Sequence, residues 1–205
     1  MATADKSIDP RILDCAKAEF LAKGYLGASL AEICGAAGVT TGALYKRYKG
    51  KEDLFAALVD GTIEDLGEIV RVKRLAPERL SDDELIRAWD MDREYMLWWF
   101  RYLYDRYDVM RLLLTRSEGT KYSGFEHEWV EAMRSATCAY YREAYRRGLT
   151  HADVSEREMH VMLSAFWMTI YEPIVHGFSW EDVSALSDKI CDLFDWYKLL
   201  GFPKG

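Results

Sequence analysis

Apolar residues recur three and four positions apart along most of this chain, which is the spacing that gathers side chains on one face of an α-helix. Only four prolines interrupt the 205 residues. We find neither the apolar–polar alternation of a half-buried strand nor an Asn-Gly hairpin signal. The pattern therefore predicts an all-α protein.

Breaks in the pattern predict several short helices at the start of the chain, over residues 9–24, 29–38 and 40–48, with a fourth from residue 51. Ser29 and Glu32 have the spacing of a capping box at the start of the second helix. Gly38 supplies a tight turn at its end. Longer helices are expected over residues 82–102, 105–116, 122–147, 155–177 and 181–200. We place a domain boundary near residue 55, giving a head (1–55) and a helical body (56–205).

Two short helices that meet at Gly38 have the layout of a helix-turn-helix, whose second helix lies in the major groove of DNA. The small residues Thr41, Gly42 and Ala43 would let the backbone of that second helix approach base edges. Longer polar side chains would reach phosphates, which set register without reading sequence. The candidate DNA-binding residues are Ser29, Thr40, Thr41, Gly42, Ala43, Tyr45, Lys46, Arg47 and Lys51.

The head resembles that of the TetR family of bacterial transcriptional regulators. The matching residues are Ala16, Phe20, Gly24, Tyr25, Ser29, Ile33, Ala37, Gly38, Val39, Thr41, Gly42, Ala43, Leu44, Tyr45, Tyr48, Lys51, Glu52 and Leu54. The chain departs from the family's common Leu-Tyr-x-His-Phe, because Arg47 replaces the histidine and Tyr48 the phenylalanine. The resemblance implies a bacterial cytoplasmic regulator that binds a double-stranded DNA operator as a homodimer. A small-molecule effector in the body would release it, so a repressor is expected.

Charge and cysteine content limit the functions and the cellular compartment that we expect for this chain. The formal net charge is −7, which argues against coating nucleic acid by bulk attraction, but residues 1–51 carry about +3. Such a chain would dock on DNA by one end. The four cysteines have no metal-binding spacing and are expected to be reduced. We find neither an apolar signal core nor a run long enough to span a membrane.

The last two helices carry apolar residues at helical spacing, and we expect them to form the dimer interface. The candidate interface residues are Leu163, Ile170, Ile174, Val183, Leu186, Ile190, Phe194 and Tyr197. The alternative is that the same residues close the core of a single copy.

All seven tryptophans and ten of thirteen tyrosines lie beyond residue 88. Such rings could line an apolar pocket for an aromatic or cationic effector. The candidate ligand-binding residues are Tyr95, Trp98, Trp99, Tyr102, Trp129, Met133, Met162 and Phe166. Ordinary core packing is the alternative, because aromatic residues serve both purposes.

Catalytic and metal sites have little support. Glu156 and His160, like Glu172 and His176, lie four residues apart and could share a helical face, but two ligands are too few for a metal. We expect no metal, no cofactor, no catalytic residue and no enzyme activity. The alternative to a DNA-binding regulator is a helical ligand-binding or protein-interaction module without selective DNA binding.

Overall fold

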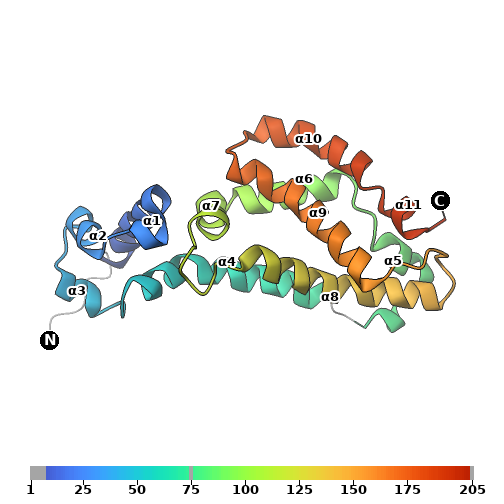
Figure 1. The fold of residues 1–205 in the computed structure, drawn as a ribbon, viewed down its shortest axis with the longest axis horizontal. Helices are drawn as coiled ribbons and strands as arrows, with labels where there is room; N and C mark the ends of the chain where they lie inside the picture. The colour runs from blue at the N-terminus through green and yellow to red at the C-terminus, as the bar shows by residue number, and fades with distance from the viewer. Residues whose placement is uncertain (1–7, 74–75, 204–205) are drawn as a thin grey trace. The chain divides into compact units, whose positions relative to one another are not determined.

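The computed structural model describes residues 8–73 and 76–203, which form helices joined by turns and contain no strand (Figure 1). The elements are α1 (Ile8–Gly27), α2 (Leu30–Ala37), α3 (Thr41–Tyr45), α4 (Lys51–Lys73), the 3-10 turn η1 (Pro77–Arg79), α5 (Asp82–Arg87), α6 (Arg93–Tyr104), α7 (Tyr107–Thr115), α8 (Phe125–Arg146), α9 (Glu156–Val175), α10 (Trp180–Leu193) and α11 (Trp196–Leu200). The all-α class predicted from the apolar spacing is confirmed.

Two of the long helices expected from the sequence are each divided into two. The 82–102 segment forms α5 and α6, and the carboxylate of Asp92 caps α6 by accepting from the N–H of Tyr95 at 2.9 Å. The 181–200 segment forms α10 and α11, where Asp195 accepts from the N–H of Lys198 at 2.9 Å. An aspartate offers the backbone a cap in place of a continuing helix, and apolar spacing alone does not reveal this competition.

The chain packs as two compact units. The first consists of residues up to Asp65 together with Arg106–Phe125, and the second of Leu66–Asp105 together with residues from Glu126 onward. By packing, the first unit therefore extends past the residue 55 boundary expected from the sequence and takes in α7. The expected functional division into a head and a body stays a prediction.

In the first unit, α1 packs against α2 and α7. Phe20 of α1 and Phe55 of α4 are fully buried, with ring centroids 5.2 Å apart. The segment after α7 is also tied to α1, because the N–H of Tyr25 donates to the carbonyl of Arg116 at 3.0 Å. The short head helices therefore gain a core larger than they could build alone.

In the second unit, α6 packs against α9 and α10 around a cluster of indole rings. Trp99 lies 4.8 Å from Trp167 and 5.9 Å from Trp129, centroid to centroid, with edge-to-face geometry. Arg147 fastens the turn before α5, since its guanidinium donates to the carbonyl of Leu80 and the carboxylate of Asp82. The core of this unit is therefore packed with aromatic rings, and hydrogen bonds from Arg147 hold the segment before α5 in place.

Candidate nucleic-acid interface

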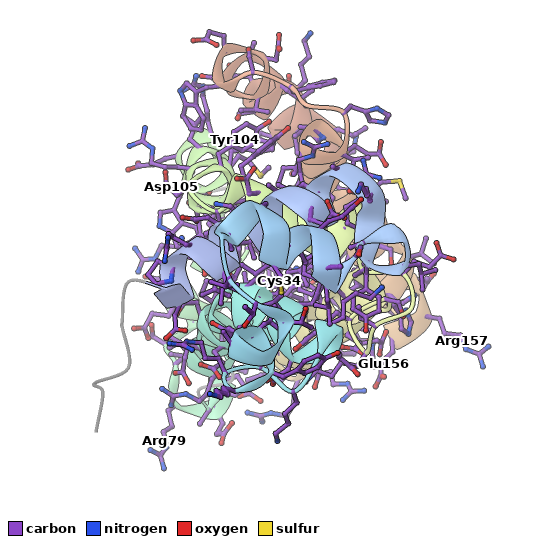
Figure 2. The ribbon with its side chains drawn as sticks, turned by 90° about the vertical axis from the view of Figure 1, so that its left-hand side faces the viewer. Cys34, Arg79, Tyr104, Asp105, Glu156 and Arg157 are labelled. Carbon is purple, nitrogen blue, oxygen red and sulfur yellow. The ribbon has the colours of Figure 1, made fainter. Side chains whose placement is uncertain are left out.

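A tight turn joins α2 to α3. Gly38 ends α2 with φ +65°, a conformation that costs other residues energy and glycine little. The next N–H, of Val39, donates to the carbonyl of Cys34 at 3.0 Å and satisfies the end of the helix. Cys34 is buried among the head's side chains, where Figure 2 labels it. The turn predicted at Gly38 is confirmed.

The start of α2 is built differently from the expectation. Ser29 precedes the helix, but its side chain makes no capping hydrogen bond, so the predicted capping box with Glu32 is wrong. The N–H of Ser29 donates instead to Oε1 of Glu19 at 3.1 Å, and Glu32 pairs with Lys23. Hydrogen bonds to Glu32 and Glu19 raise the pKa of Lys23. Residues distant in sequence have replaced the local cap.

The N-terminal end of α3 is open to solvent. Thr40 caps the helix, with its hydroxyl accepting from the N–H of Ala43 at 3.2 Å, which stabilises a helix by about 1 kcal/mol. Thr41 and Gly42 are exposed, while Leu44 on the opposite face is fully buried. Because one face is anchored in the core, the helix holds its small residues outward and can admit a base edge close to its backbone.

Of the longer side chains on α3 and just after it, two are free to reach a partner and one is held. Tyr45 is 54% exposed, and Lys46 is exposed as well. Arg47 is half-buried, and its Nε lies 2.5 Å from Oδ1 of Asp9. Arg47 therefore ties the start of α1 to the end of α3, so any phosphate it contacts competes with Asp9.

Lys51 also has an internal role. Its Nζ donates to the carbonyls of Leu26 and Ala28 at 3.2 and 3.1 Å and lies 4.7 Å from the ring centroid of Tyr25. Free carbonyls at a helix end attract cations, which explains this position. Lys51 has three N–H donors, so it can hold the end of α1 and still offer a proton to a phosphate.

Sequence reasoning missed two further lysines of the first unit. Lys49 and Lys121 line a hollow of about 490 Å³ together with Lys51 and Tyr25. Glu52 and Asp53 line it too, so the hollow is of mixed charge. Lys121 comes from the segment after α7, and local sequence carries no signal that places it beside the head. Both lysines are additional candidates for phosphate contact.

The structure divides the predicted dimer residues by burial. Leu163, Ile170, Ile174, Val183 and Ile190 are each at most 2% exposed within one copy. Leu186, Phe194 and Tyr197 are half-buried. Most of these side chains therefore close the core of their own unit. Leu186 and Ile190 also line an apolar groove on α9 and α10, so for them a place in the interface stays a prediction.

Half of the eight predicted ligand residues are part of the packed core. Trp99, Trp129, Met133 and Phe166 are at most 6% exposed, whereas Trp98 is 48% exposed. The three buried rings pack against neighbouring aromatic rings. The remaining candidates are half-buried, namely Tyr95, Tyr102 and Met162. Side chains packed this closely leave little room for an effector. Core packing, the alternative interpretation, therefore describes the four buried residues.

Of the two histidine–glutamate pairs, Glu172 and His176 are in contact at 2.9 Å, whereas Glu156 and His160 have other partners. Glu156 is held by Arg134 and Arg142, while Nδ1 of His160 lies 2.7 Å from a carboxylate oxygen of Glu131. Within residues 8–73 and 76–203 no group of three or more histidine, cysteine or acidic side chains could hold a metal ion. In the same part of the chain, no helix has both the length and the apolar character needed to cross a membrane.

Residues 12–58 match the family described as "Bacterial regulatory proteins, tetR family", which is a family of regulators rather than enzymes. The HTH-type transcriptional regulator AcrR of Shigella flexneri is 43% identical over 58 residues. That match covers 28% of this chain and 27% of AcrR, so the chain matches only about a quarter of its curated relative's length.

Solved structures resemble this chain over most of its length. NalD, the secondary repressor of the MexAB-OprM multidrug efflux pump in Pseudomonas aeruginosa, matches with a TM-score of 0.60 at 19% identity, over 92% of this chain and 93% of that one. A member of the TetR transcriptional regulator family from Streptomyces coelicolor matches with a TM-score of 0.60 at 20% identity, over 89% and 88%. The likeness at this identity concerns the fold, and it covers both units.

Proposed function

We propose that this chain, whose residues 12–58 match the TetR family of bacterial regulatory proteins, is a sequence-specific DNA-binding transcriptional repressor. The observation that carries the proposal is the N-terminal end of α3, where Thr41 and Gly42 are exposed and Ala43 is half-buried. A helix end of small side chains, held by a buried Leu44, suits insertion into the major groove.

The exposed residues divide by what they can reach. Thr41 can exchange hydrogen bonds with a base, and Ala43 can touch a thymine methyl. Tyr45 and Lys46, which are exposed on the same short helix and just after it, can contact phosphates and so fix the register. Specificity would then arise at the first turn of α3, and most of the affinity from the residues that follow.

The proposed repressor acts as a homodimer, because helix-turn-helix proteins read two half-sites about 34 Å apart. We assign self-association to a groove of about 430 Å³ on α9 and α10. It is lined by Met168, Phe178 and Leu193, which are 59%, 43% and 67% exposed. Large apolar side chains gathered on one surface indicate an interface, and a second copy of this chain would cover them.

Release from DNA would follow the binding of a small molecule to the second unit. An effector shifts a conformational equilibrium only by its differential affinity for the two states. The state it favours would hold the two heads at a spacing that no longer matches adjacent major grooves. A protein working in this way acts in the bacterial cytoplasm, where the operator is.

The experiment is selection of bound duplexes from a random library, followed by fluorescence anisotropy of the selected duplex and a scrambled one of the same composition. We expect a two-fold symmetric site that binds far more tightly than its scrambled partner, with affinity that falls as salt rises. Equal affinity for both duplexes would favour the alternative of a helical ligand-binding or interaction module without selective DNA binding.

A further inference from the structure

The second unit contains a cavity of about 220 Å³ between α8 and α9. Its walls have two kinds of chemistry. Val130 and Met168 are apolar, and the rings of Trp167 and Tyr171 stack with centroids 6.0 Å apart. Glu126 and Glu172 add a carboxylate from each helix. The space is large enough for a small molecule and not only for water.

The two carboxylates give the cavity a negative potential. Partial burial and the charge of Glu172 raise the pKa of Glu126, which means that the two groups repel each other at neutral pH. Nε2 of His176 lies 2.9 Å from Glu172. Among the described residues that line the cavity there is no lysine or arginine to balance Glu126. A cation between the two carboxylates would relieve this repulsion.

Two buried polar atoms in the same walls have no hydrogen-bond partner. They are the indole Nε1 of Trp167, whose side chain is 1% exposed, and the hydroxyl of Tyr171, which is 6% exposed. A buried donor without an acceptor is destabilising, and native proteins contain few of them. Four other buried indole nitrogens among the described residues also lack a partner, so the Tyr171 hydroxyl is the more specific sign of a ligand, independent of the acidic pair: an acceptor atom on a bound molecule would satisfy it.

We propose that this cavity binds a small organic cation with an aromatic body and a hydrogen-bond acceptor. The cationic group lies against Glu126 and Glu172, the body lies against the Trp167–Tyr171 stack, and the acceptor oxygen receives a hydrogen bond from the Tyr171 hydroxyl or the indole. Aromatic faces and carboxylates both favour a cation in such a site. The proposal that a ligand binds depends only on the cavity. The proposal that this ligand regulates DNA binding rests on the proposed repressor function.

The cavity adjoins the apolar groove assigned above to self-association. Met168 and Glu172 line both. A cation bound beside Glu172 therefore changes charge and packing at the edge of that groove. In the proposed dimer, this is a direct route from ligand binding to the relative placement of the two copies.

The test is isothermal titration of the full chain with tyramine and with tyrosol, a near-isosteric phenol in which a neutral hydroxyl replaces the ammonium group. We expect tyramine to bind at least about tenfold more tightly than tyrosol, because only tyramine carries the positive charge. Equal affinity for the two compounds, or no heat of binding with tyramine, would overturn the proposal.

Variants locate the site. Glu126→Gln should weaken tyramine binding by about tenfold or more, since it removes one carboxylate of the pair. Glu128→Gln is the matched control, because Glu128 is exposed in the same first turn of α8 and does not line the cavity. Tyr171→Phe, which keeps the ring, should also weaken binding. Equal tyramine affinity in the Glu126→Gln and Glu128→Gln proteins, with melting curves showing both folded, would contradict the assignment.

The same protein separates this proposal from the repressor function. Tyramine binding by a chain that does not select any DNA sequence would support the cavity and contradict the repressor. Selective DNA binding by a chain that does not bind tyramine would support the repressor and contradict the cavity proposal.

Discussion

At the scale of single residues, the head uses part of its positive charge to hold itself together. Lys51 closes the end of α1 by donating to two carbonyls, and Arg47 pairs with Asp9. Lys46, by contrast, is exposed at the end of α3. Basic side chains close together in sequence therefore have different tasks, and substitutions should separate stability from DNA affinity.

Lys51→Met should lower the free energy of unfolding by about 1 kcal/mol, because the carbonyls of Leu26 and Ala28 lose a charged donor at a partly exposed position. Lys46→Ala should leave stability unchanged, weaken binding to all duplexes alike and lower the salt slope by about 1. Urea unfolding and salt titrations of DNA binding check both. A Lys51→Met protein of unchanged stability would contradict the structural role.

An ion-paired carboxylate in the second unit makes stability depend on pH. Hydrogen bonds from Arg146 and Arg147 lower the pKa of Glu143 from its ordinary value of 4.5 to about 2. The folded state thus holds the charged form more strongly than the unfolded chain does. This contribution is present above pH 4.5 and is lost as the pH falls toward 2.

Glu143→Gln should therefore lower the melting temperature at pH 7, and the difference from the parent protein should shrink steadily between pH 4.5 and 2. Glu64→Gln, at an exposed position on α4, controls for the loss of a surface charge. Calorimetry over this pH range makes the comparison. A difference that stays constant with pH would show that the arginine pairs do not stabilise the charged form.

At the scale of elements, the α2–α3 turn depends on one backbone conformation. A Cβ added at Gly38 would meet nothing within 4 Å, so the cost of a side chain there comes from φ +65° alone. Gly35, one turn earlier in α2, also has open space around it but has no positive φ. The two glycines thus separate conformational strain from crowding.

Gly38→Ala should lower the free energy of unfolding by about 1 kcal/mol, because the left-handed conformation is sterically unfavourable for alanine. Gly35→Ala should raise it by about 0.5–1 kcal/mol, because alanine is the better helix former. Urea unfolding of the two variants measures both changes. Effects of the same sign would mean that the turn is not held in the left-handed region.

The helices also mark what sequence could and could not predict. The positions of α1, α2, α3 and α9 followed from apolar spacing and glycine breaks, since both are local signals. Apolar spacing did not predict which face of α9 is buried, because this helix has apolar side chains on more than one face: Ile170 is fully buried and Met168 is 59% exposed. Spacing cannot tell which apolar face meets its own core. The partners of Lys51 and Lys121 were equally hidden, because tertiary packing supplies them.

At the scale of the whole molecule, the apolar groove on α9 and α10 exposes large hydrophobic side chains that a second copy would bury. The dimer we propose predicts that Leu193→Asp weakens self-association by at least tenfold, since it buries a charge in the interface. Leu199→Asp is the matched control, because Leu199 is also exposed and does not line the groove. Sedimentation equilibrium measures both. Equal dimerisation in the two variants would place the interface elsewhere.

The central claim is that two copies of α3 read adjacent major grooves of one operator. Its most direct test is hydroxyl-radical and methylation footprinting of the duplex selected in solution. We predict two protected patches whose centres lie about 10–10.5 base pairs apart or a multiple of that spacing, with guanine N7 protected in the major groove. A Thr41→Ala protein should lose or change these base protections before it loses the phosphate contacts. Protection of a single patch, or of the minor groove alone, would contradict the account.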